Sequence, residues 1–78
     1  MKELVQYLAR SLVSNPDAVK INESENNGIA VIELKVAKED LGRIIGKQGR
    51  TAKSIRTLLN AVGARDNRRV NLEILEEN

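Results

Sequence analysis

The stretch IIGKQGR, residues 44–50, holds two glycines three positions apart, with a lysine and a glutamine between them. A glycine inside a helix costs about 1 kcal/mol relative to alanine, so a pair of glycines within a helical pattern indicates a corner between two helices. Gly46 ends a short segment of helical pattern, and Gly49 directly precedes a longer one, from about Arg50 to Val62. The sequence therefore predicts a tight four-residue corner, where missing side chains let another backbone approach closely.

Upstream of this corner the hydrophobic pattern changes its period. Residues 2–14 carry leucines and a valine at helical spacing, and Pro16 indicates where this helix ends. Residues 19–22 alternate between apolar and polar side chains, as strands do. In residues 29–36 the even-numbered side chains are all apolar, which predicts a strand buried on that face. Between them, the ENNG segment at residues 25–28 is typical of a turn, because asparagine and glycine tolerate positive φ. We therefore expect an antiparallel hairpin.

The segments around and after the corner complete the fold. A short helix is expected over about residues 38–45, with Glu39 and Asp40 in its first turn, where the helix dipole favours acidic side chains. Gly63 fits the left-handed residue that commonly closes a helix. Residues 69–74 alternate as a final strand. The expected fold is α+β, in the order α-β-β-α-α-β, with a three-stranded sheet covered by three helices on one face and one domain over residues 1–78.

Composition leaves little room for catalysis. The 78 residues include no cysteine and no histidine, which removes the thiol nucleophile and the commonest general base and transition-metal ligand. The acidic pairs Glu39-Asp40 and Glu76-Glu77 are adjacent in sequence, so they do not converge on one point, and we expect both to be solvated. No enzyme activity, metal or cofactor is expected. The chain shows neither a membrane span nor a signal peptide, which predicts a cytoplasmic protein.

Positive charge gathers around the glycine pair. From Leu41 to Arg65 there are six basic residues and no acidic ones, whereas the remainder holds seven basic and eleven acidic residues, a net charge of −4. Such a stretch can be a solvated helix face that happens to lack acids, but the glycines favour an anion site. Unpaired N–H groups at the start of the helix near Arg50 and the charge of Lys47 suit a phosphate.

The longer stretch RIIGKQGRTAKSIRTLL resembles the signature of the KH domain, approximately I-I-G-x-x-G-x-x-[small or apolar]-x-x-I. The matching residues are Ile44, Ile45, Gly46, Gly49, Ala52 and Ile55. The element order is similar to the type II arrangement of that fold, and the chain as a whole resembles the KhpA family of small bacterial RNA-binding proteins. Ala52 departs from the larger aliphatic residue of many KH domains, so we expect a shallower groove floor.

The resemblance implies binding of single-stranded RNA, with the glycine loop clamping the RNA backbone and the bases in an apolar groove. It also implies an RNA chaperone or post-transcriptional regulator, a homodimer, and a partner in a larger KH-containing protein of the KhpB/Jag type. Ile44, Ile45, Ala52 and Ile55 would occupy core or groove-lining positions. The opposite wall of the groove should come from a strand edge and a loop. The sequence leaves two candidates for that loop, the ENNG segment at residues 25–28 and the ARDNRR segment at residues 64–69. The candidate RNA-binding residues are Arg43, Ile45, Gly46, Lys47, Gln48, Gly49, Arg50 and Lys53.

Other readings compete with this one. Two helices around a glycine corner suggest a DNA-binding helix-turn-helix, but strands on both sides and a short first helix disfavour it. A protein-interaction module that dimerises and contacts RNA weakly is a stronger alternative, and Ile29 and Val31 on the outer face of their strand favour it. A nucleotide-binding P-loop would need a preceding strand and a Gly-Lys-Ser/Thr ending, and neither is present. A single aromatic residue, Tyr7, excludes a base-stacking platform.

Overall fold

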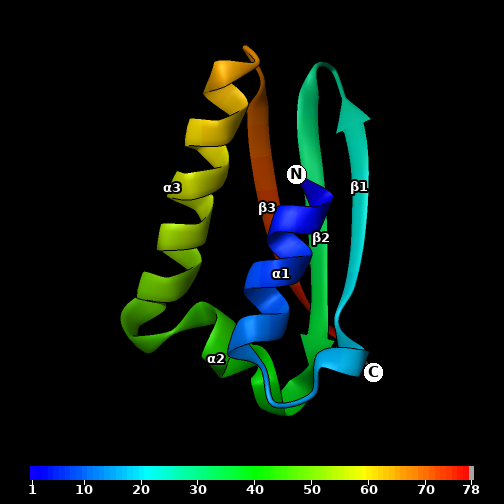
Figure 1. Cartoon of the computed structure of the whole chain (residues 1–78), viewed down its shortest axis with the longest axis vertical. Coiled ribbons are helices and arrows are strands. Elements are labelled where there is room, and N and C mark those ends of the chain that lie inside the picture. Colours follow the sequence, from blue (N-terminus) through cyan, green and yellow to red (C-terminus); the bar gives the residue numbers. More distant parts are fainter. Residues whose placement is uncertain (78) are drawn as a thin grey trace.

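The computed structural model describes residues 1–77 and confirms the predicted order and the α+β class (Figure 1). Short 3₁₀ turns precede β1, α2 and α3. The elements are α1 (Lys2–Leu12), η1 (Pro16–Ala18), β1 (Lys20–Asn26), β2 (Ile29–Ala37), η2 (Lys38–Asp40), α2 (Leu41–Ile45), η3 (Lys47–Gly49), α3 (Arg50–Arg65) and β3 (Arg69–Glu77).

The three strands form one mixed sheet in the order β1-β2-β3. β1 and β2 pair antiparallel, as expected, with Asn26 opposite Ile29. The two residues between them, Asn27 and Gly28, have φ angles of 53° and 80°, as a tight hairpin turn requires. β3 runs parallel to β2, which is possible because α2 and α3 form the crossover between them.

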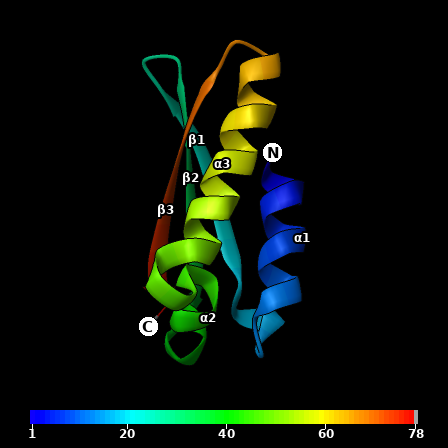
Figure 2. The same ribbon diagram turned by 90° about the vertical axis from the view of Figure 1, so that its left-hand side faces the viewer.

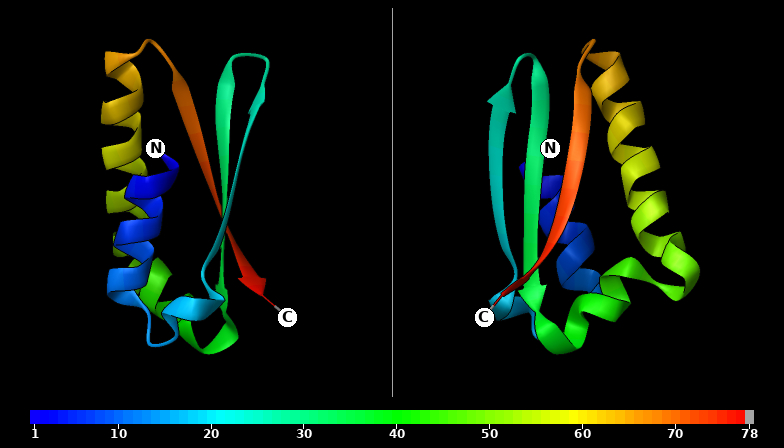
Figure 3. Two further views of the ribbon diagram at one scale, coloured as in Figure 1. Left: turned by 45° about the vertical axis from the view of Figure 1, so that its right-hand side comes forward. Right: turned by 180° about the vertical axis from the view of Figure 1, so that it is seen from behind.

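The helices lie on one face of the sheet and leave the other face uncovered (Figure 3, left). α1 and α3 lie side by side over the strands, and α2 lies at one end (Figure 2). The alternation predicted for β2 is confirmed, because every second side chain faces the helices and is buried. The core of the domain consists of Val5, Ala9, Val19, Ala30, Ile32, Leu34, Val36, Ile44, Ile55, Leu59, Val70 and Leu72.

Gly63 does not close the long helix, and that prediction was wrong. α3 continues to Arg65, and Gly63 lies buried within it. A Cβ atom on Gly63 would stand 2.7 Å from the main-chain oxygen of Arg68 and 2.8 Å from Cγ2 of Val70. The glycine is therefore required because the helix touches the start of β3 at this point. Asn67, with a φ of 56°, adopts the left-handed conformation in the following turn.

The polar loops lie far from the glycine corner. The β1–β2 turn and the loop between α3 and β3 are at one end of the molecule, whereas α2 and residues 46–49 are at the other (Figure 1). A salt bridge of 2.6 Å between Arg68 and Glu25 joins the two polar segments. α3 separates them from the corner, and its 16 residues span about 24 Å. Their arginines therefore do not add to the charge at the corner itself.

Candidate nucleic-acid interface

The glycine corner is a tight turn held by its own main-chain hydrogen bonds. The Gly46 N–H donates to the carbonyl of Gly42 at 2.8 Å and so ends α2. The Gly49 N–H donates back to the Gly46 carbonyl at 3.1 Å. Three of the four corner residues have positive φ, namely Gly46 (78°), Gln48 (58°) and Gly49 (74°). Gln48 is the non-glycine residue among them, and a left-handed glutamine stores backbone strain at an exposed loop tip.

The two glycines are required for different physical reasons. Gly46 combines φ 78° with ψ 171°, a region that essentially only glycine occupies. A Cβ atom there would also meet the side chain of Thr51, with Oγ1 at 2.2 Å and Cβ at 2.6 Å. Gly49 is left-handed at the start of α3 but has open space around it, with nothing within 4 Å of an added Cβ. Gly46 thus lets the corner fold back onto α3, and Gly49 permits the turn.

Basic side chains surround this corner, and all eight candidate residues lie together within α2, the turn and the first turn of α3. The side chains of Arg43, Lys47, Arg50 and Lys53 are exposed. Ile45 is 38% exposed and is the apolar member of the group. With glycines that expose the backbone, the corner presents main-chain groups and full positive charges on one accessible surface, an arrangement suited to an anion.

Asp40 is not the solvated acid that its neighbourhood in sequence suggests. Its carboxylate is fully buried and accepts hydrogen bonds from the Ser14 N–H at 2.9 Å, the Ser14 hydroxyl at 2.8 Å and the Asn15 N–H at 3.0 Å. Nε of Arg43 lies 3.4 Å from the same group. The bond from the Ser14 main chain is the main cause that lowers the pKa of Asp40 below its ordinary 3.8, although burial acts against it.

Asp40 thereby joins the segment after α1 to the start of α2, one short helix before the glycine corner. It holds Arg43 beside that corner while most of the arginine stays in solvent. In the two acidic pairs of the sequence, Glu39 and Glu76 are exposed, as expected. The side chain of Glu77 lies outside the described part of the chain.

The aliphatic residues of the motif divide between core and surface. Ile44, Ala52 and Ile55 are buried, which assigns them to the core rather than to an open groove floor. On the flank of α3 that faces the sheet edge, the guanidinium of Arg56 donates to the main-chain carbonyl of Leu72 at 3.4 Å. The sequence alone does not indicate this contact, because nothing local to the helix shows how close β3 comes.

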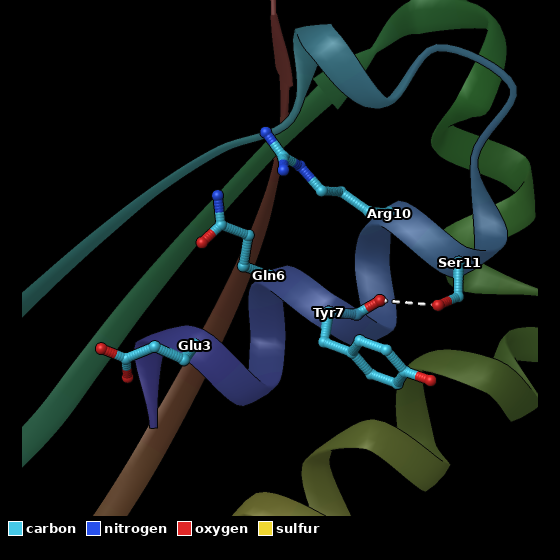
Figure 4. Close-up of a pocket in the computed structure, with 5 residues that line it drawn as sticks. All are labelled: Glu3, Gln6, Tyr7, Arg10 and Ser11. Atoms are coloured by element: carbon cyan, nitrogen blue, oxygen red, sulfur yellow. Dashed lines mark hydrogen bonds between the residues drawn. The ribbon is translucent and has the colours of Figure 1, made fainter.

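Two shallow hollows lie on the surfaces of α1 and α3. One is on α1 and is lined by Glu3, Gln6, Tyr7, Arg10 and Ser11 (Figure 4). Tyr7 is 72% exposed. The Ser11 hydroxyl donates to the Tyr7 carbonyl at 2.8 Å within the same helix, so this bond leaves the ring accessible. The second hollow is on the outer face of α3 and is lined by Lys53, Ser54, Thr57, Leu58 and Ala61.

Neither a metal centre nor a membrane span is evident in residues 1–77. No three acidic side chains there come together in a group that could hold a metal ion. No helix in the same range is long and apolar enough to cross a bilayer.

An α-β-β-α-α-β chain with a glycine corner after two isoleucines is a KH domain in the type II arrangement. The model of the family "KhpA/KhpB, KH domain" matches residues 2–74. The chain belongs to this family. A helix-turn-helix reading does not fit, since α2 has only five residues and a sheet packs behind both helices.

Curated relatives resemble the chain over almost its whole length. "RNA-binding protein KhpA" of Chlamydia pneumoniae is 52% identical over 77 residues, which is 99% of each chain. The protein of the same name from Caldanaerobacter subterraneus is 52% identical over 75 residues, 96% of this chain and 100% of the relative. In Borreliella burgdorferi the identity is 49% over 74 residues, 95% and 90% of the two chains. The family is one of RNA-binding proteins rather than of enzymes.

Among solved structures, the fold is similar to part of Era. The crystal structure of Era in complex with MgGDPNP and nucleotides 1506–1542 of 16S ribosomal RNA matches with a TM-score of 0.61 and 28% identity over 96% of this chain. A point variant of Aquifex aeolicus Era bound to GDP.AlF4- matches with a TM-score of 0.60 and the same identity. The chain spans 29% of each of these Era chains.

Proposed function

We propose that the chain binds single-stranded RNA and that the corner formed by Gly46, Lys47, Gln48 and Gly49 clamps the RNA backbone. The observation that carries this proposal is the open glycine corner inside a stretch of six basic and no acidic residues. Phosphates need close main-chain donors and positive charge, and the corner supplies both at the start of α3. Arg43, Arg50 and Lys53 add charge around it, and Ile45 offers an apolar contact for a base.

The relatives named as RNA-binding proteins support this proposal, as does a complex of Era with ribosomal RNA. The lack of aromatic side chains at the corner favours backbone clamping over base stacking, because the single tyrosine lies on α1. A surface of this size contacts few nucleotides, so we expect a dissociation constant in roughly the micromolar range.

The decisive experiment is a fluorescence-anisotropy titration of labelled single-stranded RNA with the wild type and with Lys47→Asp/Gln48→Asp. Both residues are exposed, so the variant keeps its fold, which circular dichroism checks. The double variant Lys2→Asp/Gln6→Asp, on α1, makes the same change in charge away from the corner. The proposal expects loss of binding in the corner variant alone. Equal binding by the corner variant and the wild type contradicts it.

In the cell, we propose a role as an RNA chaperone or post-transcriptional regulator in the bacterial cytoplasm. A non-catalytic surface that holds a few nucleotides of single-stranded RNA favours the unpaired state over the duplex, and this supports such a role. A fluorescently labelled RNA hairpin measures the effect directly. Faster strand exchange with the wild type than with the corner variant is the expected result.

A second candidate function, as a dimerisation or protein-interaction module, rests on apolar surface. Leu58 is 42% exposed within the hollow on α3, and Ile29 and Val31 are partly exposed on the uncovered face of the sheet. Such surface suits a homodimer, a heterodimer with a larger KH-containing protein of the KhpB/Jag type, or both. Light scattering of the wild type, Leu58→Lys and Val31→Lys tests the homodimer. A monomer at every concentration excludes it.

A further inference from the structure

Asp40 is the one buried charged residue in the described part of the chain. Its carboxylate accepts three hydrogen bonds from Ser14 and Asn15, which tie it to the segment after α1. The bond from the Ser14 main chain is the main cause that lowers its pKa, so the group is negative at neutral pH. A buried charge without an opposite partner is costly. The positive partner here is Arg43, whose Nε lies 3.4 Å from Oδ1 of Asp40.

This ion pair leaves the outer end of the arginine available. Nε lies on the stem side of the guanidinium, and the side chain of Arg43 is 61% exposed. The two Nη groups at the outer end have no other partner among residues 1–77. Two such groups can donate to two oxygens of one phosphate, which is the bidentate geometry that suits arginine.

The arginine also stands close to the glycine corner. Asp40, Arg43 and Gly46 follow one another at intervals of three residues, and residues three apart lie on the same side of a helix. They therefore form one row along α2, about 9 Å long. The Gly46 N–H donates to the carbonyl of Gly42, so the corner is fixed to the same short helix. Asp40 thus anchors Arg43 one helical turn before the corner.

The other basic side chains at the corner have no such anchor. Lys47, Arg50 and Lys53 form no ion pair within the part of the chain that the structure describes. A long side chain that is free in solution loses rotamer freedom when it binds a phosphate, whereas a side chain that is already held loses less. Arg43 is therefore the basic residue of the corner that is prepared for a phosphate before RNA arrives.

We infer that Asp40 is a positioning residue of the RNA site, which holds Arg43 through Nε so that its two Nη groups face a backbone phosphate beside the glycine corner. This inference rests on the proposed function, because the corner must hold the RNA backbone. The buried carboxylate thereby raises RNA affinity, an effect that its charge alone opposes. If Asp40 acted only through its charge, its removal would tighten RNA binding, because an acid repels phosphate.

Asp40→Asn separates positioning from charge. In an anisotropy titration with labelled single-stranded RNA, this variant should bind about three- to tenfold more weakly than the wild type, although it has lost a negative charge. Circular dichroism identifies a temperature at which the variant is fully folded. Gly63→Ala, a change at the other end of α3 that should also lower stability, is the control and should bind RNA like the wild type. Unchanged or tighter binding by folded Asp40→Asn overturns the inference.

Arg43→Lys tests the same geometry with Asp40 in place. A lysine has a single ammonium group, which the buried carboxylate retains, so the phosphate loses its partner although the net charge is unchanged. Arg43→Lys should therefore weaken binding as much as Arg43→Gln does. Arg65→Lys, an exposed arginine at the end of α3, is the matched control and should bind like the wild type. Wild-type affinity in Arg43→Lys contradicts the inference, since a point charge would then suffice.

A double-mutant cycle shows whether Asp40 acts through Arg43. If it does, adding Asp40→Asn to Arg43→Gln should weaken RNA binding no further. Additive losses would assign Asp40 a purely structural role and overturn the inference. A wild type that does not bind the RNA, or that binds it no better than Lys47→Asp/Gln48→Asp, contradicts the proposed function itself, together with this inference.

Discussion

Gly46 and Thr51 approach so closely that a Cβ atom on Gly46 would lie 2.2 Å from the threonine hydroxyl oxygen. This contact folds the corner onto the first turn of α3 and fixes where the basic side chains on both sides stand. Gly49, three residues later, has no such neighbour. The two glycines of one motif therefore differ in what they contribute to stability.

Alanine substitutions should separate these two contributions. Gly49→Ala should lower the free energy of unfolding by about 1–2 kcal/mol, because only a left-handed alanine is introduced. Gly46→Ala should cost about 3 kcal/mol or more, because the strained conformation is combined with a clash against Thr51. Urea unfolding of both variants measures the difference. Equal losses would show that the contact with Thr51 relaxes without cost.

Gly63→Ala tests the contact between α3 and β3. The added methyl group meets the main-chain oxygen of Arg68, which cannot move without shifting the strand, so a loss of about 1–3 kcal/mol is expected. Gly42→Ala is the matched control, since nothing lies within 4 Å of its Cβ position and it sits in α2. That variant should gain about 0.5–1 kcal/mol from helix propensity. If Gly63→Ala left the free energy of unfolding unchanged, this would contradict the close approach of α3 to the main chain of Arg68.

Asp40 should make the stability of the fold depend on pH in the acid range. Its pKa in the folded state lies below 3.8, so the unfolded state binds more protons in acid. The stabilisation from the carboxylate is complete above about pH 5 and declines as the pH falls through the folded pKa. Asp40→Asn should therefore be less stable than the wild type near neutral pH, and the two should converge in acid.

Thermal unfolding between about pH 7 and pH 2 measures this convergence. Glu39→Gln, which changes the exposed neighbouring carboxylate, should follow the wild-type profile. Parallel profiles for the wild type and Asp40→Asn would show that the buried carboxylate contributes no pH dependence.

Salt should weaken RNA binding in proportion to the phosphates that the corner neutralises. If the corner neutralises about three phosphates of a single strand, a plot of the logarithm of the binding constant against the logarithm of the salt concentration should have a slope near −2. Lys47→Gln should make this slope less steep by roughly the contribution of one phosphate contact. Titrations at four or five salt concentrations give both values. A slope near zero would rule out phosphate clamping.

Much of the fold follows from local patterns in the sequence. The alternation along β2 places its even residues in the core, and the asparagine-glycine turn fixes the hairpin register, so both could be predicted. The glycine corner was equally predictable, because two glycines between helical patterns have few other uses. These features depend on residues within a few positions of one another, where propensity and periodicity act.

The features that sequence reasoning missed depend on distant partners. Asp40 is bonded to residues 25 and 26 positions away, so its pair with Glu39 looks like a solvated helix start. Arg56 bonds to a strand 16 positions on. Gly63 was assigned as a helix cap because glycine serves both left-handed turns and close approaches, and one sequence does not distinguish them. In each case tertiary contact decides the role.

The parallel pairing of β2 and β3 also has a consequence for the order of folding. The β1–β2 hairpin closes through two residues and can form within microseconds, whereas Ile29 meets Arg69 only after the whole crossover between them has been closed into a loop. Arrival of β3 is therefore expected to be the slow step. A chain in which only the hairpin has formed has no third strand beside α3, so the sheet and the strand carbonyl that accepts the Arg56 bond are completed last.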